Sequence, residues 1–227
     1  MVSLLKQLTP DARASVKDRV NENERQTNAE IIPVVVASTK EYGFYQALVG
    51  FAFSLLAIGI GWYLFQDVTV TPEDWGSSVL LRFDLAKVIL IAIAGFMIGV
   101  AFARWKPAVY RSLVPARTLD ATARETAVVL FHRLKLTRTR AHTAVMICVC
   151  LFEKRVVVLG DSGINDRIEQ QDWDSLRDTV LTKVRGNDLP GALIAGIEQA
   201  GQLLSKHFPA ESDDIDEITN RLHIVTE

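Results

Sequence analysis

The sequence predicts an α/β fold with a small mixed β-sheet, interrupted by a transmembrane helical hairpin. Two long apolar runs, residues 43–65 and 85–103, are each long enough to cross a bilayer. The rest of the chain alternates β-branched runs with amphipathic helical patterns, as α/β domains do. We therefore expect one domain in two pieces, residues 1–41 and 105–227, with a membrane hairpin at 42–104.

The first piece contains a helix and a strand. Thr9 suits an N-cap and Pro10 the first helical position, so a helix is predicted to about Gln26. The run at 31–38 is almost continuously apolar and β-branched, which predicts a central strand. Pro33 argues against full pairing of its position.

The two apolar runs predict membrane-spanning helices in contact with the lipid bilayer. The first carries no charge and spans roughly 34 Å, and the second spans roughly 28 Å, with Lys87 able to snorkel. The alternative is a buried hairpin of a globular protein. Tyrosines and tryptophans lie near the ends of the runs, as in the aromatic belts of membrane proteins. They are Tyr42, Tyr45, Tyr63, Tyr110, Trp62, Trp75 and Trp105.

Each run places small residues on one helical face, which lets helices approach closely in lipid. These faces predict packing of the two spans on each other. Self-association or docking to another membrane protein is the alternative. The residues are Gly50, Ser54, Ala57 and Gly61 in the first run, and Ala92, Gly95, Gly99 and Ala103 in the second.

The distribution of charge predicts the orientation in a bacterial inner membrane. Basic residues flank the common side of the two runs, whereas the loop 66–84 is mainly acidic, so both termini and the domain should be cytoplasmic. Within that loop, Thr71-Pro72 indicates either a short interfacial helix through Trp75 or a polar connector. The net charge of −2 gives no reason to expect nucleic acid as a partner.

After the hairpin, a basic linker at 104–117 precedes a predicted helix at 120–136. Strands follow at 143–152 and 155–159, and their short connection predicts an antiparallel hairpin. Because the chain passes from the strand at 31–38 to that at 143–152 through a helix, these two strands should be parallel.

Two helices and an acidic tail complete the chain. The helices are predicted at 172–184 and 188–205, and the tail from Pro209 should be solvated. Cys148 and Cys150 lie on one face of a strand, a poor geometry for a disulfide. They are either small core residues or a metal or redox pair.

Several short motifs now resemble the TPM domain family. They are Glu24-x-x-Thr27-x-x-Glu30-Ile31, Phe131-x-x-Leu134-x-Leu136-x-x-Thr139, Glu153-x-Arg155-Val156-Val157, Gly160-Asp161-x-Gly163-Ile164, Trp173 and His207-Phe208-Pro209. The resemblance covers about 9–38 and 118–225. It implies a short mixed sheet sandwiched by helices, in a family that includes a thylakoid acid phosphatase and auxiliary proteins of membrane complexes. Ala144 stands where the family usually has glycine.

The predicted topology brings Glu30, Asp161 and Asp166 to one end of the sheet, with Thr139 as a further oxygen. Clustered carboxylates suit a hard cation such as Ca²⁺ or Mg²⁺, and an acid pair with a metal could also serve phosphate-ester hydrolysis. The alternative is that these acids cap helices and carry surface charge. The four histidines show no ligand spacing.

We therefore expect a membrane-held TPM-like domain that acts as an auxiliary, assembly or stability factor for a membrane protein complex, with a divalent cation. A membrane-bound acid phosphatase and a structural subunit of a membrane assembly are the alternatives. No group is recognised as a nucleophile with a base beside it, which favours a role without catalysis.

Overall fold

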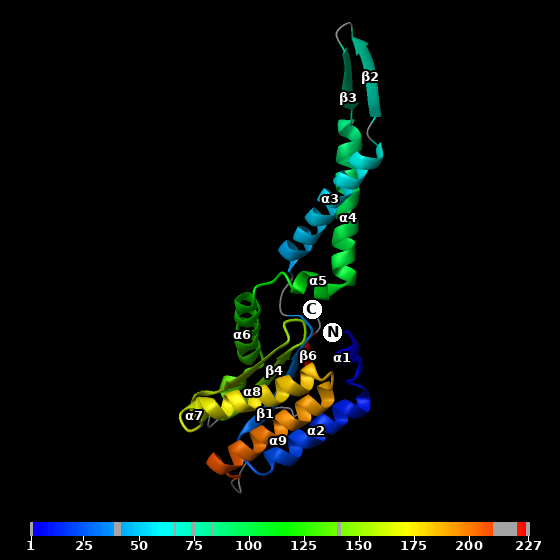
Figure 1. Cartoon of the computed structure of the whole chain (residues 1–227). Helices are drawn as coiled ribbons and strands as arrows, with labels where there is room; N and C mark the ends of the chain where they lie inside the picture. Colours follow the sequence, from blue (N-terminus) through cyan, green and yellow to red (C-terminus); the bar gives the residue numbers. More distant parts are fainter. Residues whose placement is uncertain are drawn as a thin grey trace. The chain divides into compact units, whose positions relative to one another are not determined.

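The computed structural model describes residues 2–38, 42–65, 67–73, 76–82, 84–139, 142–210 and 222–225. The chain divides into two compact units, one formed by Met1–Lys40 with Ala116–Glu227 and the other by Glu41–Pro115. The first unit is thus built from two stretches of chain that flank the second in sequence (Figure 1). We describe each unit separately.

A four-stranded mixed sheet forms the centre of the first unit. Its strands lie in the order β5-β4-β1-β6, where β1 is parallel to both β4 and β6, and β5 is antiparallel to β4. The predicted mixed sheet is confirmed, and β6 is an addition to it. The strands are β1 (Glu30–Val36), β4 (Ala144–Cys150), β5 (Arg155–Gly160) and β6 (His223–Val225).

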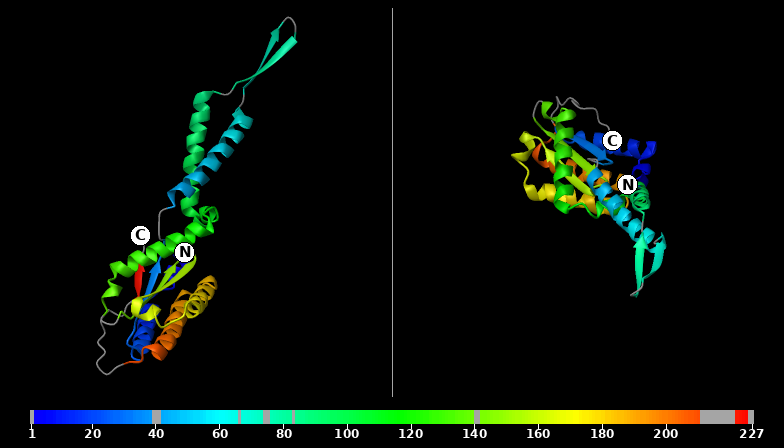
Figure 2. Two further views of the ribbon diagram at one scale, coloured as in Figure 1. Left: turned by 90° about the vertical axis from the view of Figure 1, so that its left-hand side faces the viewer. Right: turned by 90° about the horizontal axis from the view of Figure 1, so that it is seen from above.

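Helices cover both faces of this sheet (Figure 2). On one face, α2 (Pro10–Glu24), α8 (Gln170–Arg185) and α9 (Leu189–His207) form a core with side chains such as Val35. On the other, α6 (Ala116–Arg133) packs on side chains such as Val34. Successive strand residues point to opposite faces, so a strand between two helical layers must be apolar throughout, as 31–36 are.

Helices α2 and α9 begin where their caps predict, whereas α6 and α8 begin at Ala116 and Gln170, before the predicted residues 120 and 172. Thr9 Oγ1 accepts a hydrogen bond from the N–H of Ala12 at 3.2 Å, and Asp188 Oδ1 accepts one from the N–H of Gly191 at 2.9 Å. The apolar positions predicted for α8, at Trp173, Leu176, Val180 and Val184, are all buried. These caps satisfy N–H groups that have no partner within the helix.

Pro33 fits in β1 because, at its position, β1 pairs with β4 on one side but not with β6 on the other. It lies opposite Ile147 of β4, but β6 pairs only with Val34–Val36. A residue without an N–H is therefore placed before the segment of β1 that is paired on both sides.

The second unit contains two long helices, α3 (Gly43–Phe65) and α4 (Leu85–Trp105), and the short α5 (Pro107–Arg111). The predicted interfacial helix from Thr71 is wrong, because β2 (Asp67–Glu73) and β3 (Gly76–Arg82) form an antiparallel hairpin instead. The run Val68-Thr69-Val70-Thr71 is β-branched throughout, and such residues favour strands. Trp75, where that helix was expected to end, lies outside the described residues.

Other elements differ from the predictions in length or were not predicted. The helix expected to reach residue 136 ends at Arg133, because Lys135 adopts a positive φ of 58° before the single turn η1 (Leu136–Arg138). Neither α1 (Val2–Lys6) nor α7 (Ser162–Asn165) was predicted. The acidic positions of the expected solvated tail, residues 211–217, lie outside the described residues.

Candidate functional site

The predicted acids begin to converge at one end of the sheet. Glu30 lies opposite Ala144 where β1 and β4 begin, and the N–H of Asp161 donates to the carbonyl oxygen of Ala144 at 2.9 Å. Glu30 and Asp161 therefore lie on either side of Ala144, on neighbouring segments. We call this end, with Glu30, Ala144, Asp161 and the residues that contact them, the acidic end of the sheet.

Asp161 is buried, and its two carboxylate oxygens already have neighbours. Oδ1 accepts a hydrogen bond from the N–H of Ser162 at 2.7 Å as the N-cap of α7. Oδ2 lies 3.1 Å from Nδ1 of His142. A cation at this carboxylate would share or displace these contacts. Capping, one of the alternatives expected from the sequence, is therefore one role of Asp161.

The other two predicted oxygen ligands, Thr139 and Asp166, differ in burial. Thr139 is buried, and its Oγ1 accepts a hydrogen bond from the N–H of Thr143 at 3.2 Å. Asp166 is exposed at the C-cap of α7. Over the part of the chain that the structure describes, no group of three or more His, Cys, Asp and Glu side chains could hold a metal ion. Ca²⁺ or Mg²⁺ at Glu30, Asp161 and Asp166 thus stays a prediction.

His142 is the residue at this end that sequence reasoning missed. Its side chain is about half exposed, 54%, while its backbone φ is 53°, an uncommon conformation for a residue with a side chain. The register of the β4–β5 hairpin could have found it. His142 lies two residues before β4 and Asp161 directly follows β5, so antiparallel pairing brings them together. The pair can orient an imidazole ring toward solvent.

Cys148 and Cys150 are core residues. Both are fully buried, neither forms a disulfide, and their sulfur atoms are 3.9 Å apart. The hydrogen bond between the Cys148 and Cys150 thiols, together with burial, raises the pKa of the Cys150 thiol far above its usual value. A neutral thiol is a poor nucleophile and metal ligand, so this pair supports packing rather than chemistry.

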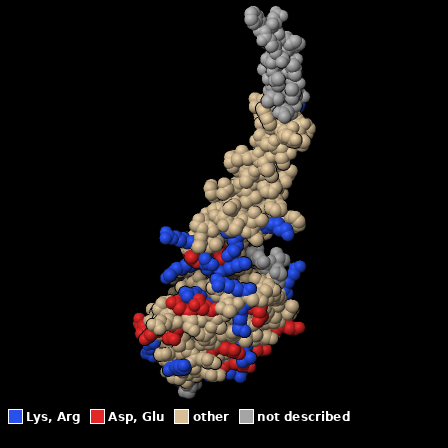
Figure 3. Space-filling view, viewed as in Figure 1, with Lys and Arg blue, Asp and Glu red and all other residues tan. Residues whose placement is uncertain are grey.

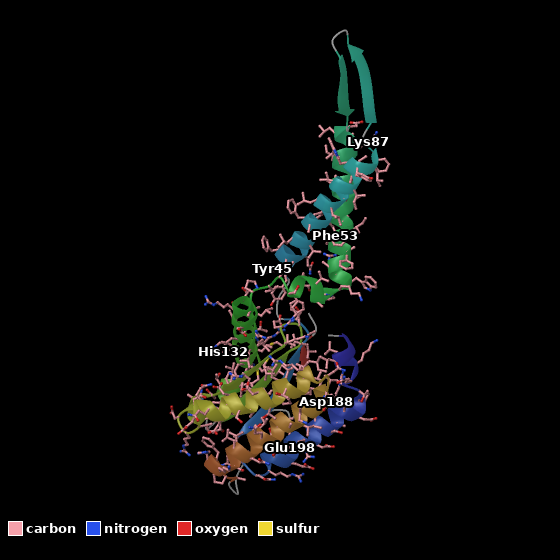
Figure 4. The ribbon with its side chains drawn as sticks, viewed as in Figure 1. Tyr45, Phe53, Lys87, His132, Asp188 and Glu198 are labelled. Carbon is pink, nitrogen blue, oxygen red and sulfur yellow. The ribbon has the colours of Figure 1, made fainter. Side chains whose placement is uncertain are left out.

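In the second unit, the small residues of α3 and α4 pack against each other. A Cβ atom added at Gly99 would lie 2.7 Å from Cβ of Phe53, and one added at Gly95 would lie 2.7 Å from Cβ of Ala57. The labelled Phe53 lies between the two helices (Figure 4), and its ring is 5.4 Å from that of Phe102. Packing of the spans on each other thus accounts for both small faces. No partner that binds through these faces is shown.

Large apolar side chains are exposed along α3 and α4, and the face seen in Figure 3 is almost without charged residues there. Both helices are long and apolar enough to cross a membrane, and only 22% and 11% of their most apolar segments are buried. This low burial distinguishes α3 and α4 from the core helices of soluble proteins, which are mostly buried. Exposed side chains include Phe51, Leu55, Leu56, Leu64, Leu90, Ile93 and Met97.

Comparisons with known proteins support the same fold. The model of the TPM domain family matches residues 112–203. The NMR structure of BA42 protein from the psychrophilic bacterium Bizionia argentinensis is similar, with a TM-score of 0.54 and 20% sequence identity. The similarity covers 96% of this chain and 94% of BA42, and at this identity it concerns the fold alone. A search of curated proteins gives no match.

Proposed function

Because the chain carries a TPM domain, we propose that it is a membrane-anchored auxiliary factor that assists or stabilises a membrane protein complex. The observation that carries the proposal is the apolar outer surface of α3 and α4. Exposed side chains such as Leu56 and Leu64 would be unfavourable in water and are favourable in lipid. Anchoring a domain to a membrane raises its local concentration near membrane proteins, because tethering raises the effective concentration of the tethered group.

The proposed orientation places both termini and the TPM domain in the cytoplasm. Arg104, Lys106, Arg111 and Arg117 follow α4 or lie near its end, and basic residues are enriched on the cytoplasmic side. A C-terminal fluorescent-protein fusion should be fluorescent, and a C-terminal alkaline phosphatase fusion should be inactive. The opposite pair of results would reverse the orientation.

A divalent cation at Glu30, Asp161 and Asp166 is a separate part of the proposal. Its support is the placement of Glu30 and Asp161 on either side of Ala144, with the carboxylate of Asp161 buried. Carboxylate oxygens suit Ca²⁺ and Mg²⁺. The auxiliary function does not depend on this ion.

One observation favours the alternative of a membrane-bound acid phosphatase. The contact between His142 Nδ1 and Asp161 Oδ2 could fix the imidazole so that its Nε2 acts as a general base or a nucleophile. Turnover of a phosphate ester by the purified full chain, lost in His142→Ala and Asp161→Asn while both remain folded, would establish this alternative. Without turnover, the auxiliary role is favoured.

Deleting the gene in the source organism tests the auxiliary function. We expect the abundance of one membrane complex to fall, and the full-length chain supplied on a plasmid to restore it. His142→Ala should restore it equally, because the auxiliary role needs no catalysis. A complex that contains the chain at fixed stoichiometry throughout its lifetime would favour the structural-subunit alternative. Unchanged abundance of all membrane complexes would contradict the proposal.

A further inference from the structure

A groove of about 770 Å³ follows strand β5 in the first unit. Strand β5 itself forms the floor, residues of α6 line one side, and residues of α8 line the other. Asn165 and Ile168 lie at the end that follows Gly160. We call this feature the β5 groove.

The floor of the β5 groove offers main-chain hydrogen-bonding groups. Among the strands that the structure describes, β5 is the last of the sheet and pairs only with β4. In an antiparallel pair, every second residue forms main-chain hydrogen bonds with the partner strand. Because the N–H of Asp161 bonds to Ala144 of β4, Val157 and Leu159 also bond to β4. Val156 and Val158 direct their N–H and C=O groups away from β4. In the described ranges, no main-chain hydrogen bond reaches the outward groups of Val156 and Val158.

The lining of the β5 groove, floor included, carries four arginines and three aspartates, an excess of one positive charge. Arg155 is paired with Asp120, and Arg177 lies 2.7 Å from Asp174 and 3.0 Å from Asp178. These two arginines thus pair with all three aspartates of the lining. The two remaining arginines of the lining, Arg124 on α6 and Arg185 on α8, are exposed and make no ion pair with any residue that the structure describes. An acidic occupant would complement them.

An apolar part of the β5 groove surrounds Trp173. This residue is 7% exposed, and its indole N–H has no hydrogen-bond partner among the described residues. Its Cζ2 would lie 3.5 Å from a Cβ atom at Gly160, which places the indole ring near the end of β5. Ile168 and Leu181 also line the groove. The indole nitrogen itself is buried, so the exposed part of the ring, Ile168 and Leu181 offer the groove an apolar surface rather than a hydrogen bond.

We propose that the β5 groove binds an extended acidic segment of a partner protein, which adds as a strand to the free edge of β5. Strand addition supplies main-chain hydrogen bonds, and side-chain contacts supply specificity. Acidic side chains of the segment meet Arg124 and Arg185, and apolar ones meet the surface around Trp173. A second copy of this chain fits less well, because pairing two β5 edges would bring these arginines near their own copies. The inference rests on the proposed auxiliary function and names how the partner is recognised.

The probe is a fluorescent peptide of about seven residues, long enough to cover β5. Because alternate side chains of a strand face opposite sides, it carries glutamate on the face toward Arg124, and on the other face one glutamate for Arg185 and valines for the surface around Trp173. Binding to the full chain in detergent micelles is measured by fluorescence anisotropy. Val158→Pro removes an outward N–H and leaves the bonds to β4 intact, so the affinity should fall about tenfold. Arg185→Glu should weaken binding about threefold or more, since an exposed attraction becomes a repulsion.

Matched controls separate the groove from general effects of charge and folding. Lys183→Glu changes the same charge on the same helix outside the groove, and it should leave the affinity within about twofold. Circular dichroism and the melting temperature establish that each variant is folded. A peptide with alternate amide nitrogens methylated, unable to pair as a strand, should bind at least about tenfold more weakly.

Three results would overturn the inference. They are no binding of the acidic peptide up to about 1 mM, equal binding by the methylated peptide, and equal binding by folded Val158→Pro. Concentration-dependent dimerisation that Val158→Pro abolishes, without peptide binding, would assign the groove to a second copy instead. If the peptide fails but deleting the gene still lowers the abundance of a membrane complex, the groove inference falls and the auxiliary function stands.

Discussion

Helices α9 and α3 are both long and apolar and both bury small residues, yet they place their large apolar side chains differently. Helix α9 buries its large side chains, including Leu193 and Ile197, against the sheet and exposes polar ones. Helix α3 buries mainly small residues, with Val49 the exception among its buried positions, and exposes large ones such as Phe51 and Leu55. The first pattern is that of a helix whose solvent is water, and the second is that of a helix whose solvent is lipid.

The difference shows that composition alone does not decide what an apolar helix does. In water, burial of large apolar side chains drives packing, whereas in lipid that driving force between helices is absent and close backbone approach decides. The predictions below test this contrast between the two units, beginning with the largest expected effect.

Truncating a buried side chain of α9 should have the largest effect. Leu193 is fully buried, so Leu193→Ala should lower the free energy of unfolding of the first unit by about 2–5 kcal/mol. Leu56→Ala, at a residue 61% exposed on α3, should change the stability of the full chain in micelles by less than about 0.5 kcal/mol. Urea unfolding followed by tryptophan fluorescence measures both. Equal losses of stability in Leu193→Ala and Leu56→Ala would contradict the contrast between α9 and α3.

A divalent cation should stabilise only the first unit, since Glu30, Asp161 and Asp166 belong to it. At a hundredfold excess over Kd, calcium or magnesium should add about 2.7 kcal/mol and raise the melting temperature of that unit. Asp161→Asn should remove most of the rise, because it deletes a charged oxygen ligand while nearly keeping the shape. If the wild-type chain shows no shift, Asp161 is a helix cap and partner of His142 only.

Adding a methyl group between α3 and α4 should weaken the hairpin. In Gly99→Ala the new Cβ would lie 2.7 Å from Cβ of Phe53 and 2.8 Å from Cα of Gly50, so the helices must move apart, at a cost of about 1–3 kcal/mol. The control is Gly59→Ala, where no atom lies within 4 Å of the added Cβ. Unfolding by sodium dodecyl sulfate, followed by circular dichroism, should separate the two variants. Equal resistance of the two variants to sodium dodecyl sulfate would show that the small residues do not determine how closely α3 and α4 pack.

The smallest effect is expected at a surface ion pair between α2 and α9. Arg19 lies 3.3 Å from Glu198, and both side chains are more than 40% exposed. A double-mutant cycle with Arg19→Ala and Glu198→Ala should give a coupling energy of about 0.2–1 kcal/mol that decreases with added salt. A coupling above about 2 kcal/mol would show that the pair is less solvated than its exposure indicates.

Much of the fold could be predicted because its signals are local. Caps at Thr9 and Asp188, the helical spacing from Trp173 to Val184 and the β-branched run at 31–36 each depend on residues close in sequence. The pairing of the three longer strands then followed from chain connectivity. Strand β6 was missed because three residues carry no periodicity, and its position depends on a partner almost two hundred residues away.

The acidic end of the sheet was predicted less completely. Connectivity placed Glu30 and Asp161 near each other, but whether a carboxylate is available to a ligand depends on local hydrogen bonds. Asp161 contacts the N–H of Ser162 and the ring of His142, and neither contact has a signature in spacing alone. His142 was not predicted as a site residue because it lies between two elements, where its neighbours depend on the register of the β4–β5 pair.

The central claim is that α3 exposes its large apolar side chains to lipid. The most direct test is whether the side chain at Leu56 contacts lipid or water. A nitroxide label on Leu56→Cys in lipid nanodiscs should collide with molecular oxygen and be protected from a water-soluble nickel complex. The same label on Val129→Cys, at a residue 58% exposed on α6, should show the opposite preference. Cys148 and Cys150 are fully buried and should not be labelled in the folded protein. If the Leu56 label meets the nickel complex, or is shielded from both reagents, α3 does not face lipid and the account is contradicted.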